Sequence, residues 1–393
     1  MMKAIELFAG AGGLGIGVSQ AGFHPQLVVE RDRWCCDTLR ENLVSKKSAL
    51  RNWPTPTEAD VRRIDFKKFK NAVDLVTGGP PCQPFSIGGR HGAHNDERDM
   101  WSEVVRAIRE VKPRAFIFEN VKGLTRATFA SYLSYIDKQL SYPEILKRPD
   151  EEWLDHLARL ERHHTGKKGP RGLEYRVLFQ VLNAANYGVP QRRERVVFVG
   201  FRTDLGIAWN FPKKTHSLDA LIWEQMKGDY WDLHEVRKKD RVVSDRFKAR
   251  YNQIGQQPAE LPWRTTRDAL RGLPDPEKDI QASSEFSNHR FQSGARSYVG
   301  HTGSPLDEPA KTLKAGVHGV PGGENMLLRP DGSVRYFTVR ESARLQTFPD
   351  HFKFHGSWSE TMRQLGNAVP VRLASVVATH VRDHLTLAGN IGR

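Results

Sequence analysis

Short apolar runs alternate with amphipathic stretches along the first 120 residues. The runs AIELFAG, QLVVE, AVDLVTGG and RAFIFEN are typical of buried strands, and each ends in Gly, Glu or Asn. The stretches between them, such as IGVSQAGF and MWSEVVRAIREV, have the spacing of amphipathic helices. This alternation predicts an open, mainly parallel α/β sheet, in which ligands gather at the carboxyl ends of the strands.

The pattern changes three times after this region. Residues 137–172 are charged and contain a predicted helix, EEWLDHLARLERHH, so they are interpreted as an insertion. The stretch YRVLFQVLNAANYGVPQRRERVVFVGF predicts a helix, a turn and a buried strand. Periodicity is weak over 202–337, which predicts a second, irregular domain. Helices return in FTVRESARLQTF and SETMRQLGNAVPVRLASVVATHVRDHL, so the expected domains are 1–201, 202–337 and a returning segment, 338–393.

The composition excludes several classes of protein. Only three cysteines occur in 393 residues, which excludes a disulfide framework and argues against a cysteine-rich zinc module. The apolar start of the chain contains Glu6 and five glycines, so export is not expected. No apolar run is long enough for a membrane helix. The net charge of +14 fits either a solvated surface or a polyanionic partner, and the basic stretches at 61–70, 162–172, 191–195 and 236–250 favour nucleic acid.

A glycine-rich turn, FAGAGGLGIG, follows the first predicted strand. Such a turn lets the backbone approach a ligand closely, although dinucleotide enzymes use a similar turn and a merely tight turn is the plain alternative. Glu30 ends the next strand, where its carboxylate could accept both ribose hydroxyls, and Asp60 could accept an adenine amino group. The pattern predicts an adenosyl ligand without a pyrophosphate.

The turn GGPPCQPFS presents Cys82 at the carboxyl edge of the sheet. A thiol between Pro-Pro and Gln-Pro is unlike a buried structural cysteine, so Cys82 is predicted to be a nucleophile. Cys35 and Cys36 are adjacent on a predicted helix with no nearby ligand set, so they are interpreted as structural, and no metal site is expected.

Two further motifs carry charged groups near strand ends. Glu119 follows the apolar run of FIFENV, and poorly hydrated surroundings would raise its pKa and favour proton donation, with a helix cap as the alternative. In QRRERVVFV, the alternation of side chains along a strand directs Arg193 and Arg195 to the same side. One of the two could instead serve only a structural salt bridge.

Taken in order, these motifs resemble the DNA (cytosine-5)-methyltransferase family, in particular its bacterial and phage modification enzymes. The set comprises FAGAGGLG, Glu30, Asp60, GGPPCQPFS, ENV, YGVPQRRER, RESARLQTFP and RQLGNAVP. The resemblance implies a Rossmann-like mixed sheet that binds S-adenosylmethionine, formed by 1–201 and 338–393. It also implies a smaller, irregular target-recognition domain at 202–337.

The resemblance also implies roles for individual residues. It makes Cys82 the nucleophile, places Glu119 at N3 and the amine of the target cytosine, places Arg195 at its O2, and lets Arg193 steady the site. Arg31 replaces the hydrophobic residue common after the ribose acid, so Trp34 or another group would cover the adenine. Cofactor contacts are expected from Phe8, Ala9, Gly10, Ala11, Gly12, Gly13, Leu14, Glu30, Asp60, Val61, Pro80, Trp101, Asn367 and Val369. DNA contacts are expected from Ser86, Arg90, Gln191, Thr312, His318 and Asn325.

The implied activity is methyl transfer from S-adenosylmethionine to C5 of a flipped-out cytosine in a specific double-stranded DNA sequence. Alternatives are a cytosine-5 RNA (tRNA) methyltransferase and a catalytically inactive DNA-binding protein. A nicotinamide dehydrogenase would leave PCQ, ENV and QRRER unexplained. A cytoplasmic monomer is expected, with no membrane association and with a cognate restriction endonuclease that acts on the same DNA site without direct contact.

Overall fold

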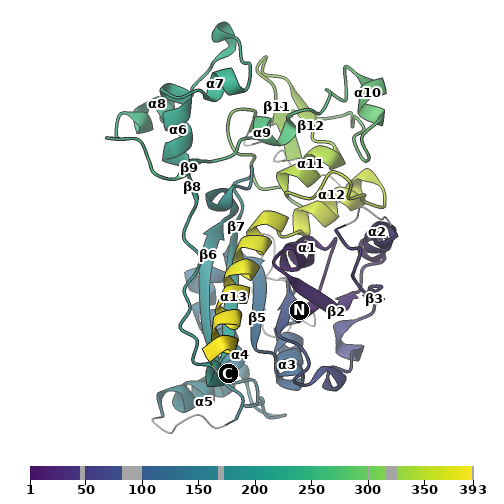
Figure 1. The fold of residues 1–393 in the computed structure, drawn as a ribbon, viewed down its shortest axis with the longest axis vertical. Helices are drawn as coiled ribbons and strands as arrows, with labels where there is room; N and C mark the ends of the chain where they lie inside the picture. The colour runs from purple at the N-terminus through teal and green to yellow at the C-terminus, as the bar shows by residue number, and fades with distance from the viewer. Residues whose placement is uncertain (45–48, 82–99, 167–171, 300, 316–324, 392–393) are drawn as a thin grey trace.

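The chain forms a larger body around one sheet and a smaller body above the sheet's upper end (Figure 1). A computed structural model describes residues 1–44, 49–81, 100–166, 172–299, 301–315 and 325–391. No helix in these ranges is long and apolar enough to cross a membrane.

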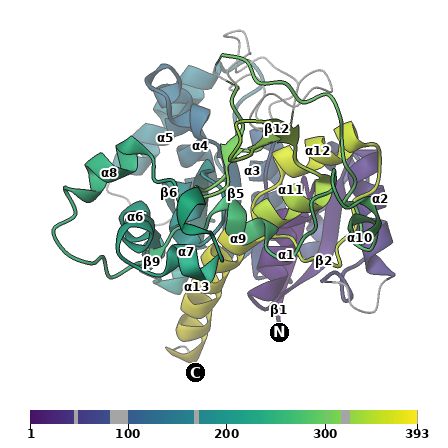
Figure 2. The same cartoon turned by 90° about the horizontal axis from the view of Figure 1, so that it is seen from above.

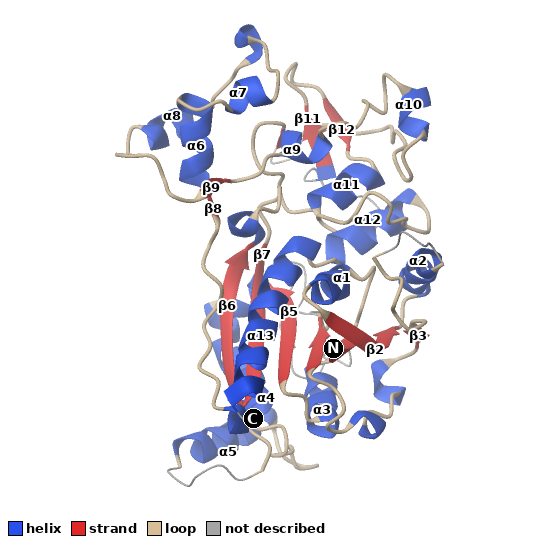
Figure 3. Cartoon of the chain, viewed as in Figure 1, coloured by secondary structure: helices blue, strands red, loops and turns tan. Residues whose placement is uncertain are grey.

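Seven strands make the main sheet, in the order β3-β2-β1-β4-β5-β7-β6 (Figure 3). Neighbours from β3 to β5 are parallel, whereas β7 runs antiparallel to both β5 and β6. The strands are β1 (Met2–Leu7), β2 (Phe23–Glu30), β3 (Thr57–Glu58), β4 (Leu75–Gly78), β5 (Ala115–Val121), β6 (Tyr175–Asn183) and β7 (Glu194–Arg202). The predicted mixed α/β sheet is confirmed. The strand order reverses between β1 and β4, which is where such sheets open a crevice for ligands.

Helices cover both faces of the sheet. One face packs against α1 (Gly13–Gln20) and α13 (Val371–Ile391), and the other against α3 (Trp101–Val111) and α4 (Ala130–Ser141). The helix α2 (Arg33–Leu43) follows β2 and contacts β3. A Cβ on Gly17 would lie 2.5 Å from the Cβ of Ala374, so glycine lets α1 and α13 pack closely. The last helix of the chain therefore returns to the first, as the sequence predicted.

The helix predicted at the start of YRVLFQVLN is wrong, because these residues form the strand β6 at the edge of the sheet. Nine residues pair in antiparallel register with β7, from Tyr175 with Arg202 to Asn183 with Glu194. Leu178 and Phe179 are both exposed at this edge, so the stretch lacks the alternation that marks a half-buried strand. Antiparallel pairing with β7, the next strand along the chain, decides its structure.

The charged insertion packs onto the larger body. Its predicted helix is confirmed as α5 (Trp153–Thr165), and Leu157 and Leu160 join the cluster that also holds Tyr135 of α4. The buried His156 bonds to the hydroxyl of Tyr135 at 2.9 Å.

The smaller body consists of short elements spread over the end of the sheet (Figure 2). Trp209 packs against Phe201 of β7 and against Phe211, so we propose that the second domain begins after Phe211 rather than at Arg202. Its elements up to Tyr336 are β8 (His216–Ser217), α6 (Leu218–Met226), α7 (Tyr230–Leu233), α8 (Asp245–Tyr251), β9 (Leu261–Pro262), α9 (Thr266–Leu270), α10 (Ile280–Ser284), β10 (Ser304–Pro305), β11 (Met326–Leu328) and β12 (Val334–Tyr336). The chain then forms α11 (Val339–Leu345) and α12 (Trp358–Asn367) before α13.

Candidate active site

A cavity of about 1240 Å³ lies at the carboxyl ends of β1, β2, β4 and β5. Its walls include the glycine turn after β1, the ends of β2 and β5, and the segment 366–369 that joins α12 to α13. The cavity thus lies where the strand order reverses, and both ends of the chain contribute to it.

The glycine turn is held by the Glu30 side chain and by close contact with the C-terminal segment. The amide of Gly10 donates to Glu30 Oε2 at 2.7 Å. Gly10 has a φ of 54°, and no atom of the described residues lies within 4 Å of the place where its Cβ would stand. A Cβ on Gly13 would lie 2.3 Å from the carbonyl oxygen of Val369, so the turn and the C-terminal segment are in close contact. The cavity is lined by Phe8, Ala9, Gly10, Gly13 and Leu14 of this turn. Ala11 and Gly12, which were also expected to contact the cofactor, are not among its lining residues.

Glu30 has a fixed carboxylate. Its Oε1 accepts the amides of Arg31 and Asp32, both at 2.7 Å, while Oε2 accepts that of Gly10. Three backbone donors thus orient this acceptor at the cavity wall, and one further lone pair on Oε2 can take a hydroxyl.

Asp60 also lines the cavity and is held by Arg62. The guanidinium of Arg62 donates through Nε at 3.0 Å and through a terminal nitrogen at 2.6 Å, and Arg31 lies 3.8 Å away. These hydrogen bonds from Arg62 lower the pKa of Asp60 to about 2. Asp60 is therefore an ionised acceptor at neutral pH, next to the buried Val61.

Glu119 and Arg195 form an ion pair in the same cavity. Arg195 Nε lies 2.7 Å from Glu119 Oε1, and both residues line the wall. In the antiparallel register Glu119 faces Val197, which places Arg195 two residues away on the same face of the sheet. Burial raises the pKa of Glu119, and the charges of Arg195 and Arg193 oppose this shift. The carboxyl group therefore holds a proton to higher pH than an exposed glutamate does.

Arg193 is fully buried beneath this pair. Its terminal nitrogens donate to the carbonyl oxygens of Leu313 at 3.0 Å and Gly366 at 2.7 Å. Burial lowers its pKa, and the charge of Glu119 counteracts this. Arg193 thus fastens the end of the second domain and the C-terminal segment to the strand that carries Arg195.

The chain leads from β4 to the expected nucleophile along one wall of the cavity. Pro80 and Pro81 line the cavity, and the Pro80 carbonyl accepts the side-chain amide of Asn120 at 3.2 Å. A Cβ on Gly79 would lie 3.4 Å from Glu119 Oε2. Cys82 follows Pro81 in the sequence, but Cys82, Ser86, Arg90 and His318 lie outside the described residues.

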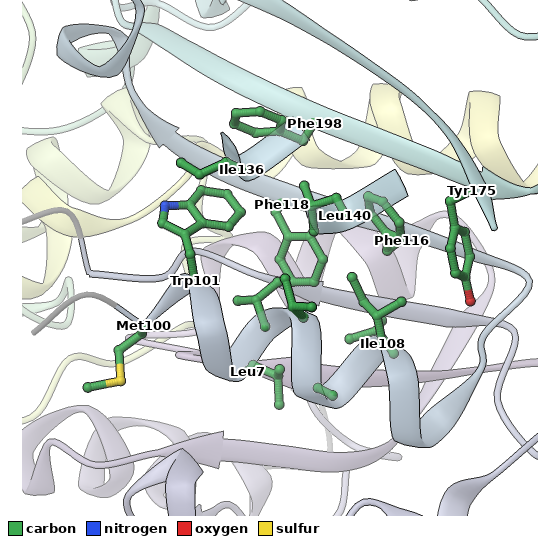
Figure 4. Packing of buried hydrophobic residues seen from close by; sticks show 14 of the residues in the cluster. Leu7, Met100, Trp101, Ile108, Phe116, Phe118, Ile136, Leu140, Tyr175 and Phe198 are labelled. Atoms are coloured by element: carbon green, nitrogen blue, oxygen red, sulfur yellow. The ribbon is translucent and has the colours of Figure 1, made fainter. Parts of the chain in front are cut away.

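Trp101 is not brought to the cavity. It is 1% exposed and packs edge-on against Phe118 and Phe198 in the core between α3 and the sheet (Figure 4). Its neighbour Met100 lines the cavity instead. The large indole takes the core position because α3 starts at Trp101 with its apolar face towards β5 and β7.

Three residues expected to contact DNA bond to backbone instead. Gln191 is fully buried, accepting the amide of Leu313 at 3.1 Å and donating to the Leu345 carbonyl at 3.4 Å. Thr312 donates to the Arg192 carbonyl at 2.6 Å, and the buried Asn325 bonds to the backbone of Lys314 in both directions. Gln191 and Thr312 thus tie residues 312–313 to the segment before β7, and Asn325 holds the backbone of Lys314. In this structure the three side chains position backbone.

Several cavity residues were not singled out from the sequence. Arg363 bridges Asp32 at 2.8 Å and Glu360 at 2.6 Å, linking α12 to the start of α2. Lys314 also lines the wall. Trp34, which the resemblance offered as a cover for the adenine, lines the cavity and stacks on His355. Asn367 and Val369 line it as expected. The motif RQLGNAVP contained Arg363, but only the fold shows its acidic partner.

Comparison with known proteins identifies the family. The sequence model described as C-5 cytosine-specific DNA methylase matches residues 2–142 and 167–383, omitting most of the insertion that contains α5. The Type II methyltransferase M.PspPI of a Psychrobacter species is 33% identical over 98% of this chain and 80% of its own length. M.Eco47II of Escherichia coli is 31% identical over 96% of this chain and 78% of its own length.

Solved structures share the fold. A DNA modification methyltransferase encoded within an E. coli prophage superposes with a TM-score of 0.59 at 20% identity, covering 98% of this chain and all of the other. The Dnmt2 methyltransferase of S. pombe superposes with a TM-score of 0.53 at 17% identity, covering 98% of this chain and 99% of the other. With its family model matched along most of its length, the chain belongs to the C-5 cytosine-specific DNA methylase family.

Proposed function

We propose that this enzyme methylates C5 of a cytosine within a specific double-stranded DNA sequence, with S-adenosylmethionine as the methyl donor. The observation that carries the proposal is the shared cavity. The Glu119–Arg195 pair and the Pro80–Pro81 turn, which precedes Cys82 in the sequence, line the same cavity as the glycine turn and Glu30. An acid and a cation for the base thus line the same cavity as acceptors suited to an adenosyl group, and the proposed nucleophile follows Pro81 in the sequence.

The residues present fit the cofactor. The carboxylate of Glu30, fixed by three amides, can accept a ribose hydroxyl, and the ionised Asp60 can accept an amino group of adenine. The open space beside Gly10 lets the backbone approach the ligand closely. When bound, S-adenosylmethionine supplies the methyl group.

The protein's own groups make the base reactive. The Cys82 thiolate adds to C6 of the cytosine, and the electron pair of the C5–C6 bond shifts towards N3, where Glu119 supplies a proton. Arg195 holds O2 of the base and keeps Glu119 oriented. C5 then has enamine character and can accept a methyl group. Loss of the C5 proton to water re-forms the C5–C6 double bond as the C6–S bonding pair returns to Cys82. N3 gives its proton back to Glu119, which restores the starting form of the acid.

The target base must leave the duplex for this chemistry, because C6 is hidden in stacked DNA. Flipping costs a few kcal/mol, which contacts to the opened duplex offset. Recognition of the DNA sequence would then lie in the second domain. Its residue Leu313 is bonded to Gln191 and Arg193, which directly precede the strand that carries Arg195.

The names of the relatives further suggest a modification enzyme of a restriction-modification system. We propose that the enzyme acts as a monomer in the cytoplasm, where it methylates each strand of its site in turn. A cognate endonuclease would act on the same sequence without direct contact.

A radiolabelled methyl-transfer assay with DNA and RNA substrates tests the proposal. Label should enter duplex DNA with the wild-type chain and be lost with Cys82→Ala. Label in RNA alone would show that the enzyme is an RNA methyltransferase. DNA binding without any transfer would show an inactive DNA-binding protein.

A further inference from the structure

A second cavity, of about 570 Å³, lies behind the segment that carries Val369. Its walls come from the larger body at Gln20, Gly188 and the first turn of α13, and from the smaller body at Arg264 and α9. Phe348 lines this cavity and also packs beneath the glycine turn, 3.2 Å from where a Cβ on Gly13 would stand. The cavity thus adjoins the cofactor site from the opposite side, at the junction of the two bodies, and the proposed mechanism does not use it.

Three arginines line this cavity, and two lack a carboxylate partner. Arg344 is paired with Asp350 through hydrogen bonds of 2.8 and 2.7 Å. Within the described part of the chain, neither Arg264 nor Arg372 forms an ion pair. Asp268, also on the wall, is engaged by His234 at 3.2 Å and by the amide of Thr265 at 2.7 Å. The arginines that line the cavity outnumber its carboxylates, so the wall carries a net positive charge.

The positive charges of Arg264 and Arg372 act on each other and on the nearby His216. Burial lowers the pKa of Arg372, and the nearby charge of Arg264 lowers it further. His216, behind Gly188, has its pKa lowered to about 4 by burial, then by Arg372 and Arg264, so its ring is neutral at pH 7. An anion between the two arginines would relieve this repulsion.

The position of Arg372 is fixed by a glycine. Its Nε donates to the Tyr187 carbonyl at 2.7 Å. Gly188 has a φ of 82°, and a Cβ there would lie 2.8 Å from Arg372 Nε and 2.7 Å from His216 Cε1. Only glycine leaves room for both groups. Only the Nε of this guanidinium has a hydrogen-bond partner in the described ranges, so the terminal nitrogens remain for a ligand.

A strained residue also shapes the wall. Thr347 has a φ of 60°, a conformation that β-branched residues rarely adopt. Its hydroxyl accepts the amide of Arg372 at 2.9 Å and donates to the Gln346 carbonyl at 2.7 Å. The amide of Val371 donates to Gln346 as well, so the first amides of α13 are already used. A ligand here would be held by side chains and not by the helix terminus.

We propose that this cavity binds a phosphate group between the guanidinium groups of Arg264 and Arg372. Guanidinium forks match phosphate oxygens and form charge-assisted hydrogen bonds with them. The phosphate would belong either to a free phosphate compound or to the DNA backbone. Because Arg264 and Arg372 come from different bodies, bound phosphate would tie the second domain to α13.

Calorimetric titration with inorganic phosphate, at constant ionic strength set with chloride, tests the proposal. Wild-type protein should bind phosphate saturably, and Arg264→Gln and Arg372→Gln should each weaken binding at least ~10-fold, since each removes a charged donor. Arg237→Gln removes the same charge from an exposed position paired with Asp240 and should bind like wild type. Arg264→Gln changes an exposed side chain and should keep the wild-type unfolding temperature. Arg372→Gln can lower that temperature, because it also removes the hydrogen bond to the Tyr187 carbonyl.

A second titration, with duplex DNA lacking any methylation site, shows whether the bound phosphate belongs to the DNA backbone or to a free compound. If the DNA backbone is the source, the duplex should displace phosphate, and Arg264→Gln should weaken binding of the duplex. If the source is a free compound, phosphate should bind equally with and without DNA. Either result supports the site. Equal phosphate affinity in Arg264→Gln, Arg372→Gln and Arg237→Gln would overturn the proposal, as would the lack of saturable binding to wild-type protein.

Discussion

Glu119 and Glu6 are both buried carboxyl groups of the main sheet, but their surroundings differ. Glu119 is 8% exposed, lines the cavity and is paired with Arg195. Glu6 is 2% exposed and accepts the amide of Gly15 at 2.9 Å, with no cation in hydrogen-bond contact among the described residues. The first carboxyl group can exchange a proton with a bound base, whereas the second supports the glycine turn from below.

Replacing Glu119 by Gln should slow methyl transfer by about 10²–10⁴-fold, the usual contribution of a positioned acid, while DNA affinity changes little. The amide can still donate a hydrogen bond but cannot transfer a proton. Single-turnover rates and equilibrium binding to the same duplex measure the two effects. Equal losses in rate and affinity would make Glu119 a binding residue only.

The pH dependence follows from the direction of the shift. Because burial raises the pKa of Glu119, its protonated form persists to higher pH than that of an exposed glutamate. Activity that needs this proton should fall as pH rises through the raised pKa. The high-pH limb should disappear from the residual activity of Glu119→Gln, and an unchanged limb would assign it to another group.

Glu6 should make stability depend on pH. Burial is the largest cause that raises its pKa, from 4.5 to about 8, so the folded state binds its proton more tightly than the unfolded state does. The free energy of unfolding should therefore fall between pH 4.5 and 8, by on the order of 4 kcal/mol. Urea unfolding of Glu6→Gln should lack this decline, while the exposed Glu285→Gln should retain it. Identical profiles in all three proteins would contradict the assignment.

The pairing of α1 with α13 joins the first and last helices of the chain. Gly17→Ala would place a methyl group 2.5 Å from Ala374 Cβ and from the Val371 carbonyl oxygen, so it should destabilise the fold by about 1–3 kcal/mol. Gly389→Ala makes the same change in α13, where only one side-chain atom lies within 4 Å, and it should stabilise the fold by up to ~1 kcal/mol. Chemical denaturation that shows the same sign for both variants would contradict this packing.

The elements that carry the site could be predicted because their signals are local. Each strand from β1 to β5 that ends at the cavity, apart from the two-residue β3, is a mainly apolar run with a polar or glycine residue at its end or within the next three residues. The strand β6 could not be predicted, since its exposed Leu178 and Phe179 hide the alternation that marks a half-buried strand.

The roles of single side chains were harder to predict than the positions of the strands, because those roles depend on partners that are distant in the sequence. Gln191 looks like a base reader in sequence, yet its partner Leu313 lies 122 residues away and the bond is buried. The residues Trp101 and Asn325 were likewise assigned to ligands but serve the core and the backbone. Only long-range packing distinguishes such uses of a polar or aromatic side chain.

The charge of the whole molecule sets how it meets DNA. With a net charge of +14, the chain should bind duplex DNA with a log–log salt slope of roughly −0.9 per phosphate neutralised. About six such contacts would lower affinity ~10³-fold between 50 and 200 mM salt. Fluorescence anisotropy with a labelled duplex measures the slope. Affinity that stays constant across this range would exclude a binding surface dominated by phosphate contacts.

The covalent step is tested most directly with DNA that carries 5-fluorocytosine at the target position, together with S-adenosylmethionine. Cys82 can still add to C6 and C5 can still accept the methyl group, but fluorine cannot leave as a cation in place of the proton. The protein should therefore stay bonded to the DNA in a complex that survives denaturing electrophoresis. Cys35→Ala and Cys36→Ala, which remove buried thiols, should form it normally. Cys82→Ala should form none, and trapping by Cys82→Ala at the wild-type level would contradict the mechanism.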